Sequence, residues 1–166
     1  MKTIILYATK YGATAEIAKR IADRLEDATI HDLKQGSVPQ LSDFECVIIG
    51  SSVYIGSFRK EAKAFIKQNA DELCKKKLGL FISAMSELDD SEAFKANIPK
   101  EVLQEAFVTG DLGGVFDPKK GNCFERLIMK IVTKQSGYVN TINEEKIIKF
   151  TDAIKAQVKH QARSSQ

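Results

Sequence analysis

Short apolar runs rich in β-branched residues alternate along this chain with segments that have the period of a helix. Each run is bounded by turn residues and is too short for a buried helix, so it indicates a strand. The runs lie at residues 3–8, 28–33, 46–50, 78–84 and 106–110. Alternating strands and helices need right-handed crossovers. We therefore predict an α/β fold: a doubly wound, five-stranded parallel sheet with helices on both faces.

The segments between the strands carry apolar residues at helical spacing. One predicted face consists of Ile17, Ala18, Ile21, Ala22 and Leu25, and another of Phe58, Ala62, Phe65, Ile66 and Leu73. A last helix should begin after Asn143, a capping residue followed by Glu144 and Glu145. Its predicted apolar face consists of Ile147, Thr151, Ile154 and Val158. At 166 residues the chain fits one domain, which we expect over 1–160, with a polar tail at 161–166 that frays.

Ligands of such sheets bind outside the carboxyl ends of the strands, so the loops that follow strands are the candidate sites. The first loop joins a strand to a helix whose leading N–H groups are unpaired, which favours an anion. Its hydroxyls and its glycine suit a terminal phosphate, whereas the dinucleotide and Walker patterns are absent. The alternative is an ordinary turn capped by Thr14. The candidate residues are Thr9, Lys10, Tyr11, Gly12, Ala13 and Thr14.

Two further loops suit a flat ring. The loop at 51–58 places an aromatic residue among small polar residues and a glycine, and an aromatic face stacks well on a planar heterocycle. The loop at 83–90 offers backbone amides and a soft methionine side chain. The alternative is that Tyr54 is a half-exposed loop aromatic and Gly56 a turn residue. The candidates are Ser51, Ser52, Val53, Tyr54, Ile55 and Gly56 in one loop, and Ser83, Ala84 and Met85 in the other. A fourth candidate segment is 110–114.

Composition excludes several other classes of protein. Cys46, Cys74 and Cys123 are odd in number and form no C-x-x-C pair, so neither a disulfide framework nor a zinc site is expected. The histidines, His31 and His160, lie in unrelated segments, and we expect no metal centre. A net charge of +3 is too small to indicate nucleic acid. No apolar stretch approaches the roughly 20 residues of a membrane span. We expect a cytoplasmic protein.

These residues resemble the flavodoxin-like family of FMN-binding proteins. Residues 9–14 resemble the family's phosphate loop, residues 51–56 its first ring loop and residues 83–87 its second. The resemblance implies the strand order 2-1-3-4-5 and FMN as cofactor. It implies no catalytic side chain, because the flavin ring carries the redox chemistry.

A narrower resemblance is to the menaquinone-dependent protoporphyrinogen dehydrogenase branch. It is carried by the first residues of the chain and by residues 124–134 with Ser136 and Gly137, in an insertion at about 114–138. Arg126, Lys130 and Lys134 recur there beside an apolar stripe, which indicates a basic amphipathic helix. Such a helix either rests on the anionic inner face of the membrane, where a quinone is met, or packs on the domain's own sheet.

Three functions remain open at this point. The first is an FMN oxidoreductase that passes electrons from a reduced organic substrate, such as protoporphyrinogen IX, to a quinone. The second is a soluble flavodoxin that carries electrons between partner redox proteins, which an acidic face around the ring would favour. The third is a phospho-acceptor receiver domain. It ranks far behind, because it needs acidic residues at the ends of the first and third strands and this chain lacks them there. Since Lys10, Arg59 and Lys60 lie in the expected loops, we predict a less negative flavin potential than in acidic flavodoxins.

Overall fold

A computed structural model describes residues 1–85, 90–119 and 137–164 of the chain, with side chains described up to residue 157. Its centre is a parallel sheet in the order β2-β1-β3-β5-β6, to which the short strand β4 is added antiparallel to β3. The predicted fourth and fifth strands are β5 and β6, so the predicted order is confirmed. The strands are β1 (Thr3–Ala8), β2 (Ala28–Asp32), β3 (Cys46–Tyr54), β4 (Ser57–Phe58), β5 (Lys77–Ser83) and β6 (Ala106–Asp111).

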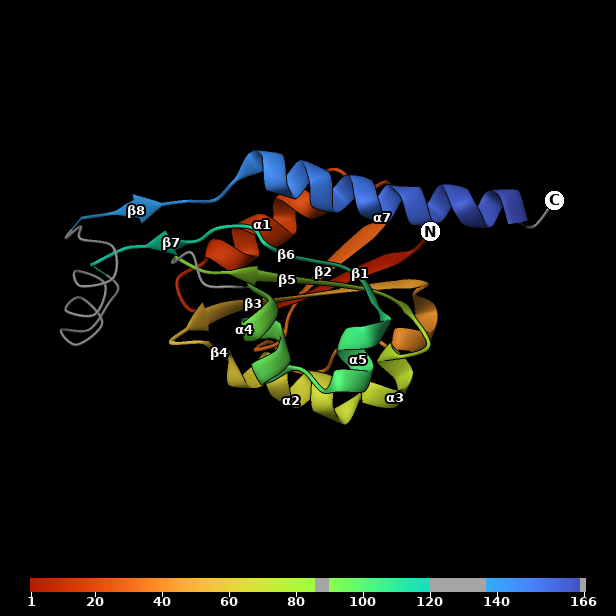
Figure 1. Cartoon of the computed structure of the whole chain (residues 1–166), viewed down its shortest axis with the longest axis horizontal. Coiled ribbons are helices and arrows are strands. Elements are labelled where there is room, and N and C mark those ends of the chain that lie inside the picture. The colour runs from red at the N-terminus through yellow and green to blue at the C-terminus, as the bar shows by residue number, and fades with distance from the viewer. Residues whose placement is uncertain (86–89, 120–136, 165–166) are drawn as a thin grey trace.

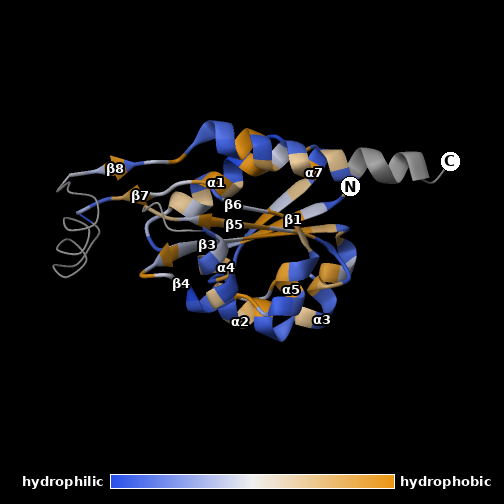
Figure 2. Cartoon of the chain, viewed as in Figure 1, coloured by the Kyte–Doolittle hydropathy of each residue, from blue (hydrophilic) through white to orange (hydrophobic). Residues whose placement is uncertain are grey.

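Helices cover both faces of the sheet, as Figure 1 shows. One face carries α1 and α7, and the other carries the remaining helices. The helices are α1 (Ala13–Ala22), α2 (Lys60–Gln68), α3 (Ala70–Leu73), α4 (Asp90–Asn97), α5 (Lys100–Glu105) and α7 (Glu144–Ser164), with a 3-10 turn η1 at Leu41–Asp43. Hydrophobic residues concentrate in the central strands and on the inward sides of the helices (Figure 2). The two faces bury separate apolar clusters, which is the doubly wound architecture that the sequence predicts.

The strands end together at one edge of the sheet. Tyr7 of β1 lies opposite Gly50 of β3, Gly50 opposite Phe81 of β5, and Phe81 opposite Gly110 of β6. Gly50 is required there, because a Cβ atom would lie 2.1 Å from the Phe81 ring. The loops after these strands therefore converge on one region.

Two predicted elements differ from the structure. β3 continues to Tyr54 and turns back through β4, so much of the predicted loop at 51–58 is a hairpin. Phe58 belongs to β4 rather than to a helix, and its ring packs on Phe94 with centroids 5.9 Å apart. The predicted second helix is also divided at Asn69, whose backbone (φ −115°, ψ 18°) is not helical.

The last helix begins where the sequence predicts it. The Asn143 side chain accepts a hydrogen bond from the backbone N–H of Lys146 at 3.0 Å, as a capping residue should. Glu144 pairs with Arg20 and Arg24 and so ties α7 to α1. The helix continues to Ser164, into the 161–166 range for which we predicted fraying.

A small ribbon follows the sheet. It consists of β7 (Val115–Phe116) and β8 (Val139–Asn140), which pair antiparallel beyond the carboxyl edge of the sheet (Figure 1). Most of the predicted insertion at 114–138, with Arg126, Lys130 and Lys134, lies outside the described residues. Within the described part of the chain, no helix is long and apolar enough to cross a membrane.

Candidate functional site

The turn between β1 and α1 has the geometry of an anion cradle. Gly12 adopts φ +95° at the start of α1, and its N–H donates to the Thr9 hydroxyl oxygen at 3.0 Å. A glycine takes that conformation without strain, and a Cβ atom added to Gly12 would meet nothing within 4 Å. The helix that follows begins with Ala13, and the first N–H groups of a helix have no partner within it. The predicted phosphate loop therefore has the backbone that it needs.

Thr14 is a buried hydroxyl residue at the start of α1. Its side chain is completely buried, and its hydroxyl oxygen has no hydrogen-bond partner among the described residues. It lies inside α1 and makes no capping hydrogen bond, so the alternative of Thr14 as an ordinary cap is wrong. A buried hydroxyl without a partner costs about 1–3 kcal/mol. A phosphate oxygen bound at Gly12 would remove that cost.

Two lysines place positive charge around this turn. The ammonium group of Lys34, which follows β2, donates to the Thr9 carbonyl at 2.6 Å. The ammonium group of Lys10 lies 5.2 Å from the ring centroids of both Tyr11 and Tyr54. Lys10 thus joins the first loop to the end of β3 through cation–π contacts. The Tyr11 ring also meets the Phe116 ring of β7 edge-on, with centroids 6.2 Å apart.

The β3–β4 hairpin is anchored by side chains from distant parts of the chain. The Asn97 side-chain oxygen accepts the Phe58 N–H at 3.0 Å, and its amide nitrogen donates to the Gly56 carbonyl at 2.7 Å. The buried Ser51 hydroxyl accepts the Arg59 N–H at 2.9 Å and donates to the Ser52 carbonyl. Ser51 therefore holds the hairpin, whereas the sequence suggested that it faces a ligand. Val53 packs against the apolar core, and Ser52 is half-buried.

The tip of the hairpin is an unusual two-residue turn. Ile55 has φ +49° and Gly56 has φ +70°, as in turns of type I′. A β-branched residue is strained in this region by about 1–2 kcal/mol. The Ile55 side chain is nevertheless 71% exposed and gains little from burial. The tip therefore exposes an apolar side chain to solvent. The hydroxyl of the neighbouring Tyr54 is buried and has no hydrogen-bond partner among the described residues.

The segment after β6 fixes the loop after β5. One oxygen of the Asp111 carboxylate accepts the Ala84 N–H at 3.3 Å and the Gly113 N–H at 3.0 Å. Burial raises the pKa of Asp111, and these two hydrogen bonds oppose the rise. A Cβ atom on Gly114 would lie 2.9 Å from the Ala84 carbonyl oxygen and 3.2 Å from the Met85 sulfur. The third and fourth candidate segments are thus packed together.

The structure brings the predicted site residues to one end of the molecule. Ser83 is buried at the end of β5, Ala84 follows it, and Met85 is half-buried beside Gly114. Residues 86 and 87 of the predicted second ring loop lie outside the described residues. Sequence reasoning did not assign roles in the site to Lys34, Asn97, Asp111 and Phe116. Asp111 lies in the glycine-rich segment that the sequence singled out, whereas no sequence signal identifies Lys34 or Asn97.

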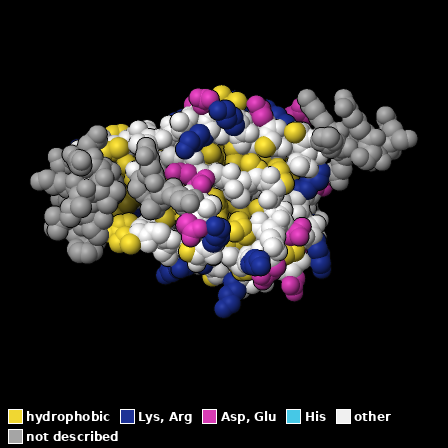
Figure 3. All heavy atoms as spheres, viewed as in Figure 1, with side chains coloured by type: hydrophobic (Ala, Val, Ile, Leu, Met, Phe, Trp, Pro, Cys, Tyr) yellow, Lys and Arg dark blue, Asp and Glu magenta, His cyan; other side chains and the backbone are white. Residues whose placement is uncertain are grey.

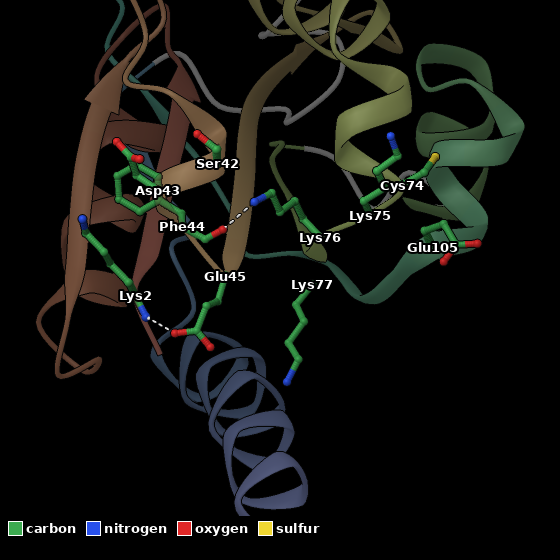
Figure 4. A pocket seen from close by; sticks show the side chains of 10 residues that line it. All are labelled: Lys2, Ser42, Asp43, Phe44, Glu45, Cys74, Lys75, Lys76, Lys77 and Glu105. Carbon is green, nitrogen blue, oxygen red and sulfur yellow. Dashed lines mark hydrogen bonds between the residues drawn. The ribbon is translucent and has the colours of Figure 1, made fainter. Parts of the chain in front are cut away.

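A separate hollow of about 710 Å³ lies at the opposite edge of the sheet, around the residues that precede β1, β3 and β5 (Figure 4). It is lined mainly by charged side chains. Lys76 donates to the Phe44 carbonyl at 2.8 Å and Lys77 to the Gln157 carbonyl at 3.1 Å.

Cys74 lines the hollow, and burial with nearby acids raises the pKa of its thiol. Burial raises the pKa of Cys46 to about 12, so neither thiol is an activated nucleophile. Among the described residues, no group of His, Cys, Asp and Glu is arranged to hold a metal ion.

Comparison with known proteins identifies what this arrangement resembles. A family model described as "Flavodoxin domain" matches residues 4–142. The flavodoxin of Streptococcus pneumonia TIGR4 aligns with a TM-score of 0.58 at 16% identity, covering 95% of this chain and 99% of that one. A flavoprotein from Lactobacillus acidophilus, crystallised in complex with FMN, aligns with a TM-score of 0.55 at 14% identity, over 66% of this chain and 92% of that one. These likenesses show the fold.

The curated relatives that match share one name. A protoporphyrinogen IX dehydrogenase [quinone] of Leishmania major is 28% identical over 162 residues, which cover 91% of this chain and 69% of that protein. The protein of the same name in Escherichia coli K12 is 32% identical over 80 residues. That match covers 44% of this chain and only 42% of the Escherichia coli protein.

Proposed function

Because the chain belongs to the flavodoxin domain family, we propose that it binds FMN at the carboxyl edge of its sheet and works as an oxidoreductase. The observation that carries this proposal is the buried hydroxyl of Thr14, which has no hydrogen-bond partner among the described residues and lies beside the open turn at Gly12. A phosphate is the group that this turn fits, since it accepts hydrogen bonds from helix N–H groups and from a hydroxyl.

The residues divide into those for the phosphate and those for the ring. Thr9, Lys10, Tyr11, Gly12, Ala13 and Thr14 would surround the phosphate. Tyr54, Ile55 and Gly56 at the hairpin tip would lie on one side of the ring, with Ala84 and Met85 on the other. Ser51, Ser52, Val53 and Ser83 would position these segments rather than touch the cofactor. FMN, when bound, supplies the electron-transfer chemistry, and the chain supplies orientation and charge.

For the reaction, we propose oxidation of a porphyrinogen with a quinone as electron acceptor. The support is the relative from Leishmania major, a protoporphyrinogen IX dehydrogenase [quinone] that aligns with 91% of this chain. The positive charges of Lys10, Lys34 and Arg59 around the site also suit an anionic electron donor.

We further propose a single domain over 1–160 and a cytoplasmic location. The basic residues Arg126, Lys130 and Lys134 would contact the inner face of the membrane, where quinones are found.

The second candidate is a soluble electron carrier that serves partner redox proteins. It is supported by the alignment with flavodoxins over nearly the whole chain, including Flavodoxin 1 of Bacillus cereus (TM-score 0.54, 96% of this chain). The charge at the site edge supports the enzyme, because the described loops present Lys10, Lys34 and Arg59 where a carrier for cationic partners would present acids.

The test combines cofactor binding with turnover. Purified protein should be yellow or should bind added FMN, and it should oxidise protoporphyrinogen IX with menaquinone as acceptor. Failure to bind FMN would refute the whole proposal. FMN binding without porphyrinogen turnover, together with rapid electron exchange with a ferredoxin reductase, would refute the enzyme and support the carrier.

A further inference from the structure

Arg59 lies at the base of the β3–β4 hairpin with its hydrogen-bonding capacity incompletely used. Its backbone is fixed by the hydrogen bond from its N–H to Ser51. Its Nε atom is buried and has no hydrogen-bond partner among the described residues. Arg59 forms an ion pair with Glu61, whose Oε2 atom is 3.9 Å from that nitrogen, too far for a hydrogen bond. Glu61 Oε2 is itself buried without a hydrogen-bond partner in the described part of the chain.

Arg59 lies next to the candidate site. Its backbone N–H is held by the Ser51 hydroxyl at 2.9 Å, and Ser51 lies opposite Ala8, the residue that precedes the first loop. With 27% of the side chain exposed, Arg59 remains accessible to a ligand. Lys10 lies against the Tyr11 ring and extends the positive charge toward Tyr54.

Apolar side chains are exposed on the two hairpins at this end of the molecule. Ile55 at the hairpin tip is 71% exposed and Tyr138 beside β8 is 62% exposed, more than any other large hydrophobic side chain that the structure describes. In Figure 3, hydrophobic side chains are visible at the end of the molecule that carries the β3–β4 and β7–β8 hairpins. The edge of the site therefore combines a cation that can bind an anion with an apolar rim.

We propose that Arg59 binds a carboxylate of the electron donor, which is an acidic molecule with an apolar ring system. A guanidinium presents its N–H groups in a planar fork that matches a carboxylate, and it would gain the hydrogen bonds that Glu61 does not accept. Arg59 is therefore a substrate-binding residue, and Glu61 competes with the substrate for it. The inference rests on the proposed function: protoporphyrinogen IX is such a molecule, with propionate side chains on an apolar macrocycle.

The test compares two substrates that differ only in charge. Protoporphyrinogen IX and its neutral methyl ester are assayed with native protein and with the variants Arg59→Gln, Glu61→Gln and Lys75→Gln. Lys75→Gln is the matched control, because this substitution also removes one positive charge, but at the opposite edge of the sheet, in the hollow of Figure 4. The dissociation constant for FMN is measured for every variant.

Loss of a hydrogen-bonded ion pair at a partly exposed site should weaken binding by about tenfold. We therefore expect Arg59→Gln to lower the ratio of kcat/KM for the acid over the ester by about tenfold, mainly through KM. Glu61→Gln should raise the same ratio, and Lys75→Gln should not alter it.

The proposal is overturned if Arg59→Gln affects the acid and the ester equally, or if its main effect is on the affinity for FMN. The latter result would make Arg59 a cofactor ligand. If native protein binds FMN but oxidises neither substrate, the proposed reaction fails instead, and a binding titration with the acid and the ester then shows whether Arg59 still distinguishes them.

Discussion

The hydroxyl of Thr14 offers a test of the phosphate cradle in which stability and affinity should change in opposite directions. Replacing Thr14 by Val keeps the shape of the side chain and removes only the hydroxyl. That hydroxyl is fully buried and has no protein partner among the described residues. Its removal relieves a desolvation cost, so the free energy of unfolding should rise by about 1 kcal/mol.

With FMN bound, the same change removes a hydrogen bond to a charged oxygen, worth about 1.5–3 kcal/mol. At about 1.4 kcal/mol for each factor of ten, the dissociation constant for FMN should rise roughly 10- to 150-fold. At a free FMN concentration of 100 times the native dissociation constant, FMN stabilises native protein by about 2.7 kcal/mol. A variant with tenfold weaker binding gains only about 1.4 kcal/mol, so it changes from more stable than native protein to less stable.

The assay is urea unfolding with and without FMN, together with a fluorescence titration of FMN. Thr3→Val is the control, because Thr3 is also buried on β1 but lies at the opposite end, where its hydroxyl donates to the Met1 carbonyl at 3.2 Å. Thr3→Val should leave the affinity for FMN at its native value. The reasoning is refuted if Thr14→Val leaves the affinity for FMN unchanged, or if it destabilises the FMN-free protein by more than about 1 kcal/mol.

Two further substitutions test how the segment after β6 is held. Asp111→Asn keeps an oxygen that can accept the Ala84 and Gly113 N–H groups but removes the charge. Burial raises the pKa of Asp111 above its ordinary 3.8. The free energy of unfolding of native protein therefore falls as the pH rises through the raised pKa. In urea unfolding, the free energy of unfolding of the variant should therefore rise relative to that of native protein between about pH 4 and pH 7. A difference that does not change with pH would contradict this. Gly113→Ala places a Cβ atom 1.9 Å from the Thr141 carbonyl oxygen at φ +85° and should cost about 2–4 kcal/mol in the same measurement. Gly36→Ala, at φ +86° with nothing within 4 Å, measures the backbone strain alone, and an equal loss in both variants would show that contact with Thr141 is unimportant.

Much of the fold is predictable because its signals are local. The first strand has the predicted bounds, Thr3–Ala8, since a β-branched run between polar residues has few alternatives to a buried strand. Asn143 ends its loop and caps α7 as predicted, because a capping hydrogen bond joins residues only a few positions apart. The convergence of the loops follows from the parallel sheet alone.

The segment 51–58 shows where local signals are insufficient. Its small polar residues have low strand propensity and therefore predict a loop. In the structure, however, Ser51 pairs with Ile82 and Ser52 with Ser83 of β5. Phe58 has helical spacing to Ala62, but it pairs with Val53 and packs on Phe94 instead. Asn97, far along the chain, supplies the hydrogen bonds that hold the turn.

The sequence by itself determined the alternation of strands and helices, the parallel sheet and the edge at which a ligand would bind, because burial periodicity and turn chemistry act over a few residues. Only the tertiary structure decided which polar groups at that edge remain available. Ser51 and Thr14 are both buried hydroxyl residues predicted to meet a ligand, yet the Arg59 backbone N–H occupies the first hydroxyl and leaves the second without a partner among the described residues. The physical reason is that hydrogen-bond satisfaction depends on groups brought close by packing.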